Sequence, residues 1–192
     1  MPTLHDKAQI APQSGALLLS EPFLPDENFK RTVVFVCEHN EEEGTFGFVV
    51  NRPLGVKVHE AVEDFPEFDA TLHLGGPVEN NTLHYLHRLG DKLPDSIEVV
   101  PGLWWGGSYE VLQILIENQE IQPEDIRLYV GYSGWSPGQL ADELKEKSWI
   151  VTQGSADHIF ATDAEVLWKQ VLQQMGGQYQ IMSNFPESPL LN

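Results

Sequence analysis

The pattern of hydrophobic and polar positions predicts a strand-rich first half, followed by strands that alternate with helices. Short runs of β-branched and aromatic residues, bounded by glycine, proline or acidic turns, are typical of strands. Such runs occupy residues 15–20, 32–39, 45–51, 70–76, 126–132 and 148–153. The acidic turn 40–44 joins two of these runs into a β-hairpin over 32–51. Within it, Gly47 indicates a bulge or a close backbone approach.

The segments between these strands carry weaker signals. Residues 82–89 alternate between polar and apolar positions and are expected to pair with residues 96–100. Residues 102–107, GLWWGG, are interpreted as a glycine-framed aromatic loop. Residues 52–55, RPLG, are expected to break the preceding strand, and residues 58–65 to form a short helix.

Helical spacing dominates the second half. Four apolar residues share one face of a predicted helix over 108–118, namely Val111, Leu112, Leu115 and Ile116. A second helix is predicted over 136–147, with Ser136 as N-cap, Pro137 at the first helical position and Gln139 completing a capping box. A third is predicted over 165–175 and ends at Gly176-Gly177. Its predicted capping box joins Thr162 and Glu165.

These elements define an α+β fold rather than a doubly wound sheet, because helices do not follow every strand. The length of 192 residues fits one domain, which is expected to hold two packed lobes. Residues 1–14 are interpreted as a mobile polar leader. Residues 177–192 are interpreted as a tail that docks back or stays mobile.

The charge of the chain narrows the class of partner. The sequence has 29 Asp plus Glu against 11 Lys plus Arg, a formal net charge of -18. Such an excess repels polyanions, and no dense basic run is present. Direct nucleic-acid binding is therefore disfavoured, and the expected partner is a protein or a small-molecule ligand.

The single cysteine, Cys37, excludes an intramolecular disulfide and a structural zinc site built from several thiolates. A reducing compartment is therefore expected. No apolar run is long enough to span a bilayer, and the N-terminus does not read as a secretory signal. The sequence predicts a cytoplasmic protein without a membrane segment, metal site or cofactor.

Common catalytic motifs are missing from the sequence, including the P-loop, the dinucleotide fingerprint, HExxH and GxSxG. The one pair with nucleophilic character is Cys37 and His39, which lie two apart on a predicted strand and therefore share a face. The alternative is a buried thiol next to a histidine at the strand end. His84 and His87 are expected to point to opposite faces of a strand, which argues against a metal pair.

Seven positions are candidates for binding, namely Arg31, Asn51, Arg52, Gly75, Gly76, Tyr132 and Trp135. Arg52 follows Asn51 directly after a strand and has the guanidinium that binds carboxylate or phosphate; the alternative is a turn capped by Asn51. Gly75-Gly76-Pro77 and Gly131–Trp135 are interpreted as turns in which the backbone must come close to another group or adopt a positive φ. Exposed amides in such turns can bind an anion, or the turns simply reverse the chain. Tyr132 and Trp135 are candidates for a pocket, an interface or the core.

Taken together, six segments resemble the YqgE/AlgH family of bacterial proteins in order and spacing, over about residues 14–175. They are SGALLLSEPFL, FKRTVVFVCEHNEEEGTFGFVVNRPL, LHLGGPV, GLWWGG, GYSGWSPGQLADEL and SWIVTQGSADHIF. The resemblance implies a bent or bifurcated β-sheet that closes toward a pseudo-barrel and is flanked by helices. It implies no established activity, although some members carry the label of transcriptional regulator.

The resemblance also gives motif positions and one departure. The family's GQLE run reads Gly138-Gln139-Leu140-Ala141 here, with acids at Asp142 and Glu143. The positions that match are Arg31, Thr32, Cys37, His39, Asn51, Arg52, Pro53, Gly75, Gly76, Pro77, Gly131, Tyr132, Gly134, Trp135, Gly138 and Gln139.

Three hypotheses follow. The first is a non-enzymatic protein that binds a protein or small ligand through a surface built from the RPL, GGP and GYSGW segments, whose side chains cluster in space. The second is an enzyme or redox sensor that uses Cys37 with His39. The third, a DNA-binding regulator, agrees least with the acidic charge.

Overall fold

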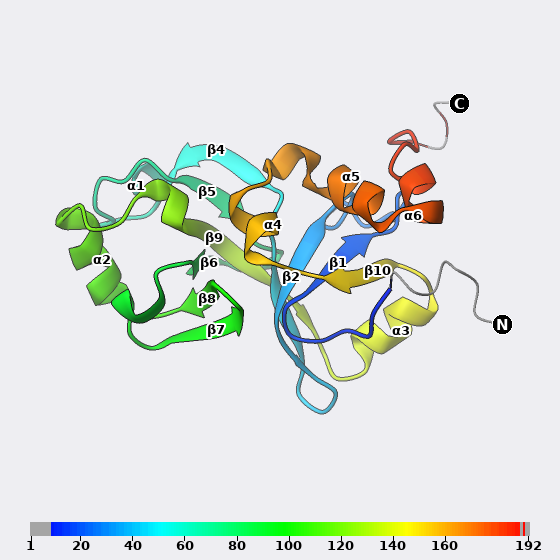
Figure 1. Ribbon diagram of the computed structural model, residues 1–192, viewed down its shortest axis with the longest axis horizontal. Coiled ribbons are helices and arrows are strands. Elements are labelled where there is room, and N and C mark those ends of the chain that lie inside the picture. Colours follow the sequence, from blue (N-terminus) through cyan, green and yellow to red (C-terminus); the bar gives the residue numbers. More distant parts are fainter. Residues whose placement is uncertain (1–8, 189, 191–192) are drawn as a thin grey trace.

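The structure, a computed structural model, describes residues 9–188 and residue 190. Ten strands and six α-helices form in these residues (Figure 1). The strands are β1 Ala16–Ser20, β2 Val33–Asn40, β3 Gly44–Val49, β4 Pro53–Lys57, β5 Thr71–Leu74, β6 Val78–His87, β7 Ser96–Val100, β8 Leu103–Gly106, β9 Ile126–Trp135 and β10 Trp149–Gln153. The α-helices are α1 Val58–Ala61, α2 Tyr109–Glu117, α3 Gln139–Lys145, α4 Ala156–Phe160, α5 Ala164–Met175 and α6 Gly177–Met182. Two short 3₁₀ turns are η1 Gly90–Lys92 and η2 Pro123–Asp125.

Strand β9 is the place where the sheet divides. Its first half pairs in parallel with β5 and, on its other side, antiparallel with β6. Its last three residues pair antiparallel with β3, from Thr45↔Trp135 to Gly47↔Ser133. The main path runs β10-β1-β2-β3-β9-β6-β8-β7, and β5 and β4 branch from β9. The predicted α+β class and bifurcated sheet are confirmed, and the described strands do not close into a barrel.

Glycines make this division possible. The amide of Gly75 donates to the carbonyl of Val130 at 2.9 Å, and the carbonyl of Gly75 accepts from Val49 at 2.7 Å. A Cβ atom at Gly75 would collide with the carbonyl oxygen of Gly131, and one at Gly76 with that of Tyr132. The GGP and GYSGW segments therefore meet as a buried backbone crossing. The predicted close backbone approach is confirmed for both segments. The interpretation of Gly131–Trp135 as a turn is wrong, because it continues strand β9, whereas Gly75-Gly76-Pro77 reverses the chain between β5 and β6 as predicted.

The strands and helices form two lobes, which lie side by side in Figure 1. The first lobe contains β1, β2, β3 and β10 with α3, α5 and α6; the second contains β4 to β8, the start of β9, and α1 and α2. One apolar cluster packs α5 against the sheet of the first lobe and continues into the second lobe through Leu86, Val100, Leu103 and Tyr129. Another packs α3 against the opposite face of the first-lobe sheet. In the second lobe, a separate cluster joins α2 to β5, β6 and β9. Helix α4 lies between the lobes.

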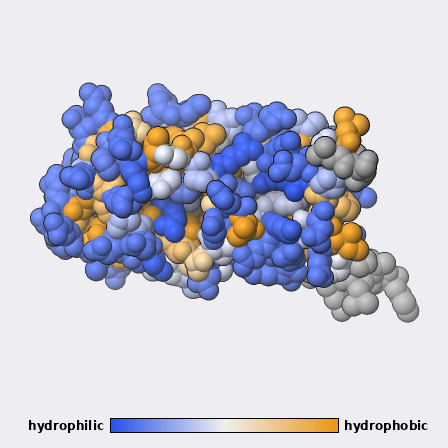
Figure 2. All heavy atoms as spheres, turned by 90° about the horizontal axis from the view of Figure 1, so that it is seen from above, coloured by the Kyte–Doolittle hydropathy of each residue, from blue (hydrophilic) through white to orange (hydrophobic). Residues whose placement is uncertain are grey.

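The surface is mostly polar. Figure 2 shows blue, hydrophilic residues over most of one face, with hydrophobic residues in small separate groups. No helix in the described part of the chain combines the length and the apolar character needed to cross a membrane.

Most segments with a strong sequence pattern have the secondary structure predicted for them. The β2–β3 hairpin is confirmed, and its register shifts between Val36 and Glu38, opposite Gly47. A Cβ atom at Gly47 would collide with the carbonyl oxygen of Phe35, so the predicted close approach is also confirmed. The helices predicted over 108–118 and 165–175 are α2 and α5. Tyr179, in the segment predicted as a tail, is buried in α6.

Two strand predictions were wrong. Residues 102–107 are not a loop, because β8 forms there and its tryptophans suit a pleated, half-buried surface. Strand β8 lies between β6 and β7, so residues 82–89 do not pair with 96–100. The break of the preceding strand at RPLG is confirmed, since β3 ends at Val49. Strand β4, which was not predicted, begins at Pro53 as an exposed strand, where a missing amide donor is tolerated.

Two helix starts also differ from prediction, and α4 was not predicted. Helix α3 begins at Gln139 rather than after Ser136, because Gly138, its N-cap, has a left-handed φ of 80° that cannot belong to the helix. The predicted contact between the Gln139 side chain and the Ser136 amide still forms, at 3.0 Å. Helix α5 is capped by Asp163 rather than Thr162; its carboxylate accepts from the amide of Glu165 at 3.0 Å. Part of the leader, residues 1–8, lies outside the described residues.

Candidate binding site at the end of the β2–β3 hairpin

The bulge in strand β2 decides which way the polar end of the hairpin faces. Val36 pairs with Gly47, whereas Glu38 already pairs with Phe46, so Cys37 is the extra residue. An extra residue in one strand shifts the alternation of the side chains that follow it. Glu38 is therefore placed beside Phe46, and both line the same cleft.

The same bulge separates Cys37 from His39. Cys37 is 4% exposed and packs in the apolar cluster beneath α5. His39 lines a hollow with Leu140, on the opposite face of the sheet, and its Nδ1 lies 2.8 Å from the Thr45 hydroxyl. The expectation that the thiol and the imidazole share a face is therefore wrong. Burial, with the nearby charge of Glu38, raises the pKa of the Cys37 thiol well above its usual value.

The turn of the hairpin is fixed against the end of β9. The side-chain oxygen of Asn40 accepts from the amides of Glu42 and Glu43, at 2.8 and 3.3 Å. Gly44 has a φ of 110°, and a Cβ atom there would collide with the carbonyl oxygen of Trp135. The turn can reach β9 only because this position has no side chain.

A cleft of about 420 Å³ opens between this turn and β9. Its walls include two carboxylates, two aromatic rings, an indole and a proline, from Glu38, Glu43, Phe46, Tyr132, Trp135 and Pro137. We call it the hairpin-end cleft. Its volume lies in the range of small-ligand pockets, roughly 300–1,000 Å³. Among the described residues, no lysine or arginine lines it.

An aromatic cluster forms the inner wall of the hairpin-end cleft. The ring of Phe46 lies 5.0 Å from those of Tyr132 and Trp105, measured between centroids. His84 meets Tyr132 edge-on at 5.9 Å. Burial lowers the pKa of His84, although Glu79 opposes this effect, so the imidazole is neutral near pH 7. Phe46 and Tyr132 of this cluster line the cleft, and His84 behind them adds no positive charge.

Helix α3 supports the other side of the cleft through one carboxylate that sequence reasoning did not single out as a site residue. The Oε2 atom of Glu143 accepts from the indole N–H of Trp135 at 2.8 Å and from that of Trp149 at 2.7 Å. Its Oε1 atom accepts from the Gln139 amide at 3.0 Å. The four-residue spacing from Gln139, which places both side chains on one face of the helix, was the available signal.

A second hollow, of about 540 Å³, lies on the other side of the hairpin end. We call it the α3 hollow; His39, Thr45, Leu140 and Leu144 line it. It shares Asn40, Gly44, Thr45 and Ser136 with the hairpin-end cleft. The two hollows are therefore separated by the tip of the hairpin and the residue that follows β9.

The remaining arginine and asparagine candidates lie at the opposite end of β3 and hold the chain together. The Asn51 side chain accepts from the amide of Val33 and donates to the carbonyl of Arg31, both at 2.9 Å. Arg52 donates to the carbonyls of Glu27 and Lys30 at 3.1 and 3.0 Å. Burial lowers its pKa, against the opposing charges of Glu27 and Asp26.

Arg31 fastens the C-terminal segment. Its guanidinium donates to the carbonyls of Phe185 and Pro186, at 2.6 and 2.7 Å, and lies 4.8 Å from the Trp168 ring centroid. Of the seven binding candidates, only Tyr132 and Trp135 line the hairpin-end cleft. The RPL and GGP segments are neighbours, because the amide of Leu74 donates to the carbonyl of Arg52 at 2.9 Å. The expectation that they form one binding surface with GYSGW is wrong, because neither Arg52 nor the GGP glycines line the hairpin-end cleft.

Sequence reasoning missed the residues that give the cleft its chemistry, Glu38, Glu43 and Phe46. The bulge indicated by Gly47 was the available signal, since it reverses the side on which Glu38 falls. In the described residues, no cluster of histidine, cysteine and acidic side chains is arranged to hold a metal ion.

The fold has counterparts among solved structures. Protein DIP2367 from Corynebacterium diphtheriae matches with a TM-score of 0.74 and 23% identity, covering 92% of this chain and 94% of that one. The solution structure of the AlgH protein from Pseudomonas aeruginosa matches with a TM-score of 0.71 and 26% identity, covering 93% and 97%. The bifurcated α+β sheet is therefore a fold shared with AlgH.

Sequence comparison identifies the family to which the chain belongs. The family model of AlgH-like proteins, DUF179, matches residues 17–180. A UPF0301 protein of Chlorobium phaeobacteroides is 47% identical over 180 residues, which are 94% of this chain and 96% of that protein. Another, from Chlorobaculum parvum, is 44% identical with the same coverage. The chain belongs to the AlgH-like UPF0301 family, which confirms the resemblance noted in the sequence.

Proposed function

We propose that this chain is a binding protein that recognises a basic segment of a partner protein, with a lysine or arginine side chain seated in the hairpin-end cleft. The observation that carries the proposal is the composition of that cleft. The carboxylates of Glu38 and Glu43 line the same hollow as the rings of Phe46 and Tyr132. An ammonium or guanidinium group is attracted both by the carboxylates and by the negative faces of such rings.

The charge of the whole molecule supports a cationic partner. A net charge of -18 steers positive ligands toward the surface and raises the rate at which they meet it. The hairpin turn adds Glu41 and Glu42 next to the cleft. The same field opposes a phosphate backbone, so a DNA-binding regulator remains the least supported alternative.

The cleft is also held in shape before any ligand arrives. Asn40 fixes the turn, Gly44 allows it to touch β9, and Glu143 holds the Trp135 indole. A preorganised site loses less conformational entropy when a ligand binds. This argument favours recognition by a rigid surface over a loop that must order.

A thiol enzyme or redox sensor stays an alternative hypothesis with less support. Thiolate character and access govern cysteine reactivity. Cys37 is buried, its pKa is raised, and His39 faces another hollow. A cytoplasmic setting remains a prediction from the single cysteine.

The proposal is tested with a short, flexible peptide that carries alternating lysine and arginine residues, titrated into the protein in a calorimeter. Removing both cleft charges with Glu38→Gln and Glu43→Gln is expected to weaken binding by about tenfold, since each close charge contributes on the order of 1 kcal/mol. Tyr132→Leu removes one ring face and is expected to weaken binding about fivefold.

The matched control is the double variant Glu110→Gln, Glu117→Gln. It removes the same net charge from exposed positions of α2 in the second lobe. If both double variants weaken binding equally, only the overall charge matters and the cleft is not the site. Absence of saturable binding to the wild type would also reject the proposal.

A further inference from the structure

A different cavity lies where the two lobes meet. This interlobe groove has a volume of about 470 Å³. Its walls come from β5, from the start of β9, and from α4 and the start of α5, and include Thr71, His73, Glu124, Arg127 and Glu165. Clefts between structural units are frequent ligand sites in proteins. None of the residues of the hairpin-end cleft lines it.

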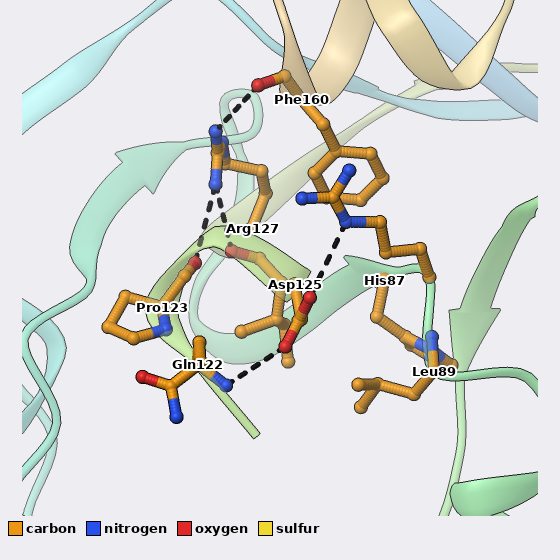
Figure 3. A network of polar contacts seen from close by, with 9 residues as sticks. His87, Leu89, Gln122, Pro123, Asp125, Arg127 and Phe160 are labelled. Atoms are coloured by element: carbon orange, nitrogen blue, oxygen red, sulfur yellow. Dashed lines mark hydrogen bonds and ion pairs between the residues drawn. The ribbon is translucent and has the colours of Figure 1, made fainter.

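Arg127 gives the interlobe groove a positive group that is only weakly bound. Its guanidinium donates to the main-chain carbonyls of Pro123, Ile126 and Phe160, at 3.4, 3.2 and 3.4 Å. Figure 3 shows it reaching from β9 between Pro123 and Phe160. Such distances exceed the usual value of about 2.9–3.0 Å for N–H···O bonds. Within the described residues, no carboxylate lies within ion-pairing distance of Arg127.

Arg88 provides a direct contrast. Both guanidiniums lie against the Phe160 ring, Arg88 at 5.0 Å and Arg127 at 5.4 Å from its centroid. Arg88, however, pairs with Asp125 at 3.5 Å and does not line the groove. In a chain with far more acids than bases, an arginine without a carboxylate partner is available for one from outside.

Of the acidic residues that line the groove, some have a bonding partner and others do not. Asp69 is paired with Lys57 at 2.7 Å, and Asp163 caps α5. Glu124 and Glu165 are exposed at the rim, and neither has a lysine or arginine partner among the described residues. The groove therefore offers one unpaired cation and two unpaired carboxylates.

His73 adds no second positive charge. It is 7% exposed, and its Nδ1 lies 3.2 Å from the carbonyl of Thr71, to which it donates. Burial, reinforced by the charge of Arg127, lowers the pKa of His73, so its ring is neutral near pH 7. Burial also lowers the pKa of His158, the other histidine that lines the groove. The balance of one unpaired cation against two unpaired carboxylates therefore holds at neutral pH.

We propose that the interlobe groove binds a small zwitterion of the free amino acid class. The carboxylate of the ligand pairs with Arg127, and its ammonium group pairs with Glu124 or Glu165. A simple anion would be repelled by the two carboxylates and by the net charge of -18. A simple cation would leave Arg127 unpaired, whereas a zwitterion complements both signs. The site and ligand are separate from those of the proposed function, so either can fail alone.

The experiment begins with a panel of free L-amino acids, added at millimolar concentration to isotope-labelled protein and followed by NMR. Saturable shifts are expected at amides that line the groove, such as those of Thr71 and Ala164. The best binder is then compared with its N-acetyl form, which lacks the ammonium charge, and with its amide, which lacks the carboxylate. Each derivative is expected to bind about tenfold more weakly or worse.

Variants assign the two charges. Arg127→Gln is expected to weaken binding about tenfold, while Arg88→Gln, which alters the other guanidinium on the same ring, leaves it within about twofold. If Arg127→Gln does not fold, the exposed double variant Glu124→Gln, Glu165→Gln decides; it should abolish the advantage of the free amino acid over its N-acetyl form. The proposal is overturned if no amino acid shifts the groove amides, or if the N-acetyl form binds equally well.

Discussion

The two halves of strand β9 share one strand but have different environments. The first half, Ile126–Val130, lies between β5 and β6, and both Leu128 and Tyr129 are fully buried. The second half, Ser133–Trp135, pairs with β3 and ends at the hairpin-end cleft. The change of neighbour takes place around Gly131, where the backbone of Gly76 crosses. Neighbouring strands, rather than the sequence of β9 itself, decide which half is core and which half is a site wall.

This difference has a consequence for where mutations act. In the first half, side chains contribute to packing between lobes and sheet layers. In the second half, Trp135 is fixed by a carboxylate on α3 while Tyr132 stays partly open to the cleft. Substitutions at the crossing should therefore damage both halves, whereas substitutions further along should affect one half at a time.

The largest effect is expected at the crossing itself. Gly76→Ala would drive its methyl group into the backbone of Tyr132, at a φ of 153° that other residues rarely adopt. Overpacking and backbone strain together should lower the free energy of unfolding by about 3 kcal/mol or more. Urea denaturation followed by circular dichroism measures the loss.

Gly55→Ala is the matched control for that variant. Gly55 also has a positive φ, of 74°, but no atom would lie within 4 Å of an added Cβ. Gly55→Ala should lower the free energy of unfolding by only about 1–2 kcal/mol, the cost of holding a residue with a side chain at a positive φ. Equal losses for Gly55→Ala and Gly76→Ala would contradict the close crossing.

An intermediate effect is expected in the second half of β9. Glu143→Ala leaves the indole N–H groups of Trp135 and Trp149 without their shared acceptor. The expected loss is about 2–3 kcal/mol, since each buried unpaired donor costs roughly 1–3 kcal/mol. Asp142→Ala, which alters an exposed neighbour on the same helix, should change stability by less than about 0.5 kcal/mol. A similar loss in both variants would show that α3, not the shared acceptor, is the cause.

The smallest effect is expected at His87 on β6, the strand that pairs with the first half of β9. His87 pairs with Ile126 and is fully buried; it donates from Nε2 to the Gly106 carbonyl and accepts at Nδ1 from the amide of Leu89. Burial lowers its pKa. The unfolded chain therefore binds a proton first, and stability from His87 is lost as the pH falls below about 6.5.

The measurement is the free energy of unfolding between pH 7.5 and 5. His87→Gln should be less stable at pH 7.5 but lose less stability on acidification, by up to about 1 kcal/mol per pH unit. Parallel curves for wild type and variant would mean that His87 does not titrate in this range.

The sequence predicted most of the fold because its strands and helices are strongly periodic. The pattern of residues 32–51 predicted a hairpin, and Gly47 indicated the close backbone approach within it. The predictions failed where tertiary contacts override local preference. GLWWGG looked like a loop because glycines frame it, yet β6 and β7 on either side make it a strand. Gly131–Trp135 looked like a turn because of its glycines, which indicated a close backbone approach but not the segment approached, Gly76.

The candidate site was less accessible to sequence reasoning. Tyr132 and Trp135 were selected, but Arg31, Asn51 and Arg52 hold backbone carbonyls and amides at the other end of β3. Glu38 resembled one of many surface acids, and its place in the cleft follows from the bulge. No pattern along the sequence predicted the interlobe groove, because Arg127 and Glu165 are far apart in the chain. They line the same cavity only through the packing of α5.

Because Trp135 and Trp149 share one acceptor on Glu143, tryptophan fluorescence can report movement of helix α3. Two of the five tryptophans depend on one oxygen atom of α3, the helix that also forms a wall of the α3 hollow. Any occupant that displaces this helix would change both indole environments at once. Intrinsic emission can therefore be used to screen for molecules that enter the hollow, without attaching a dye to the chain.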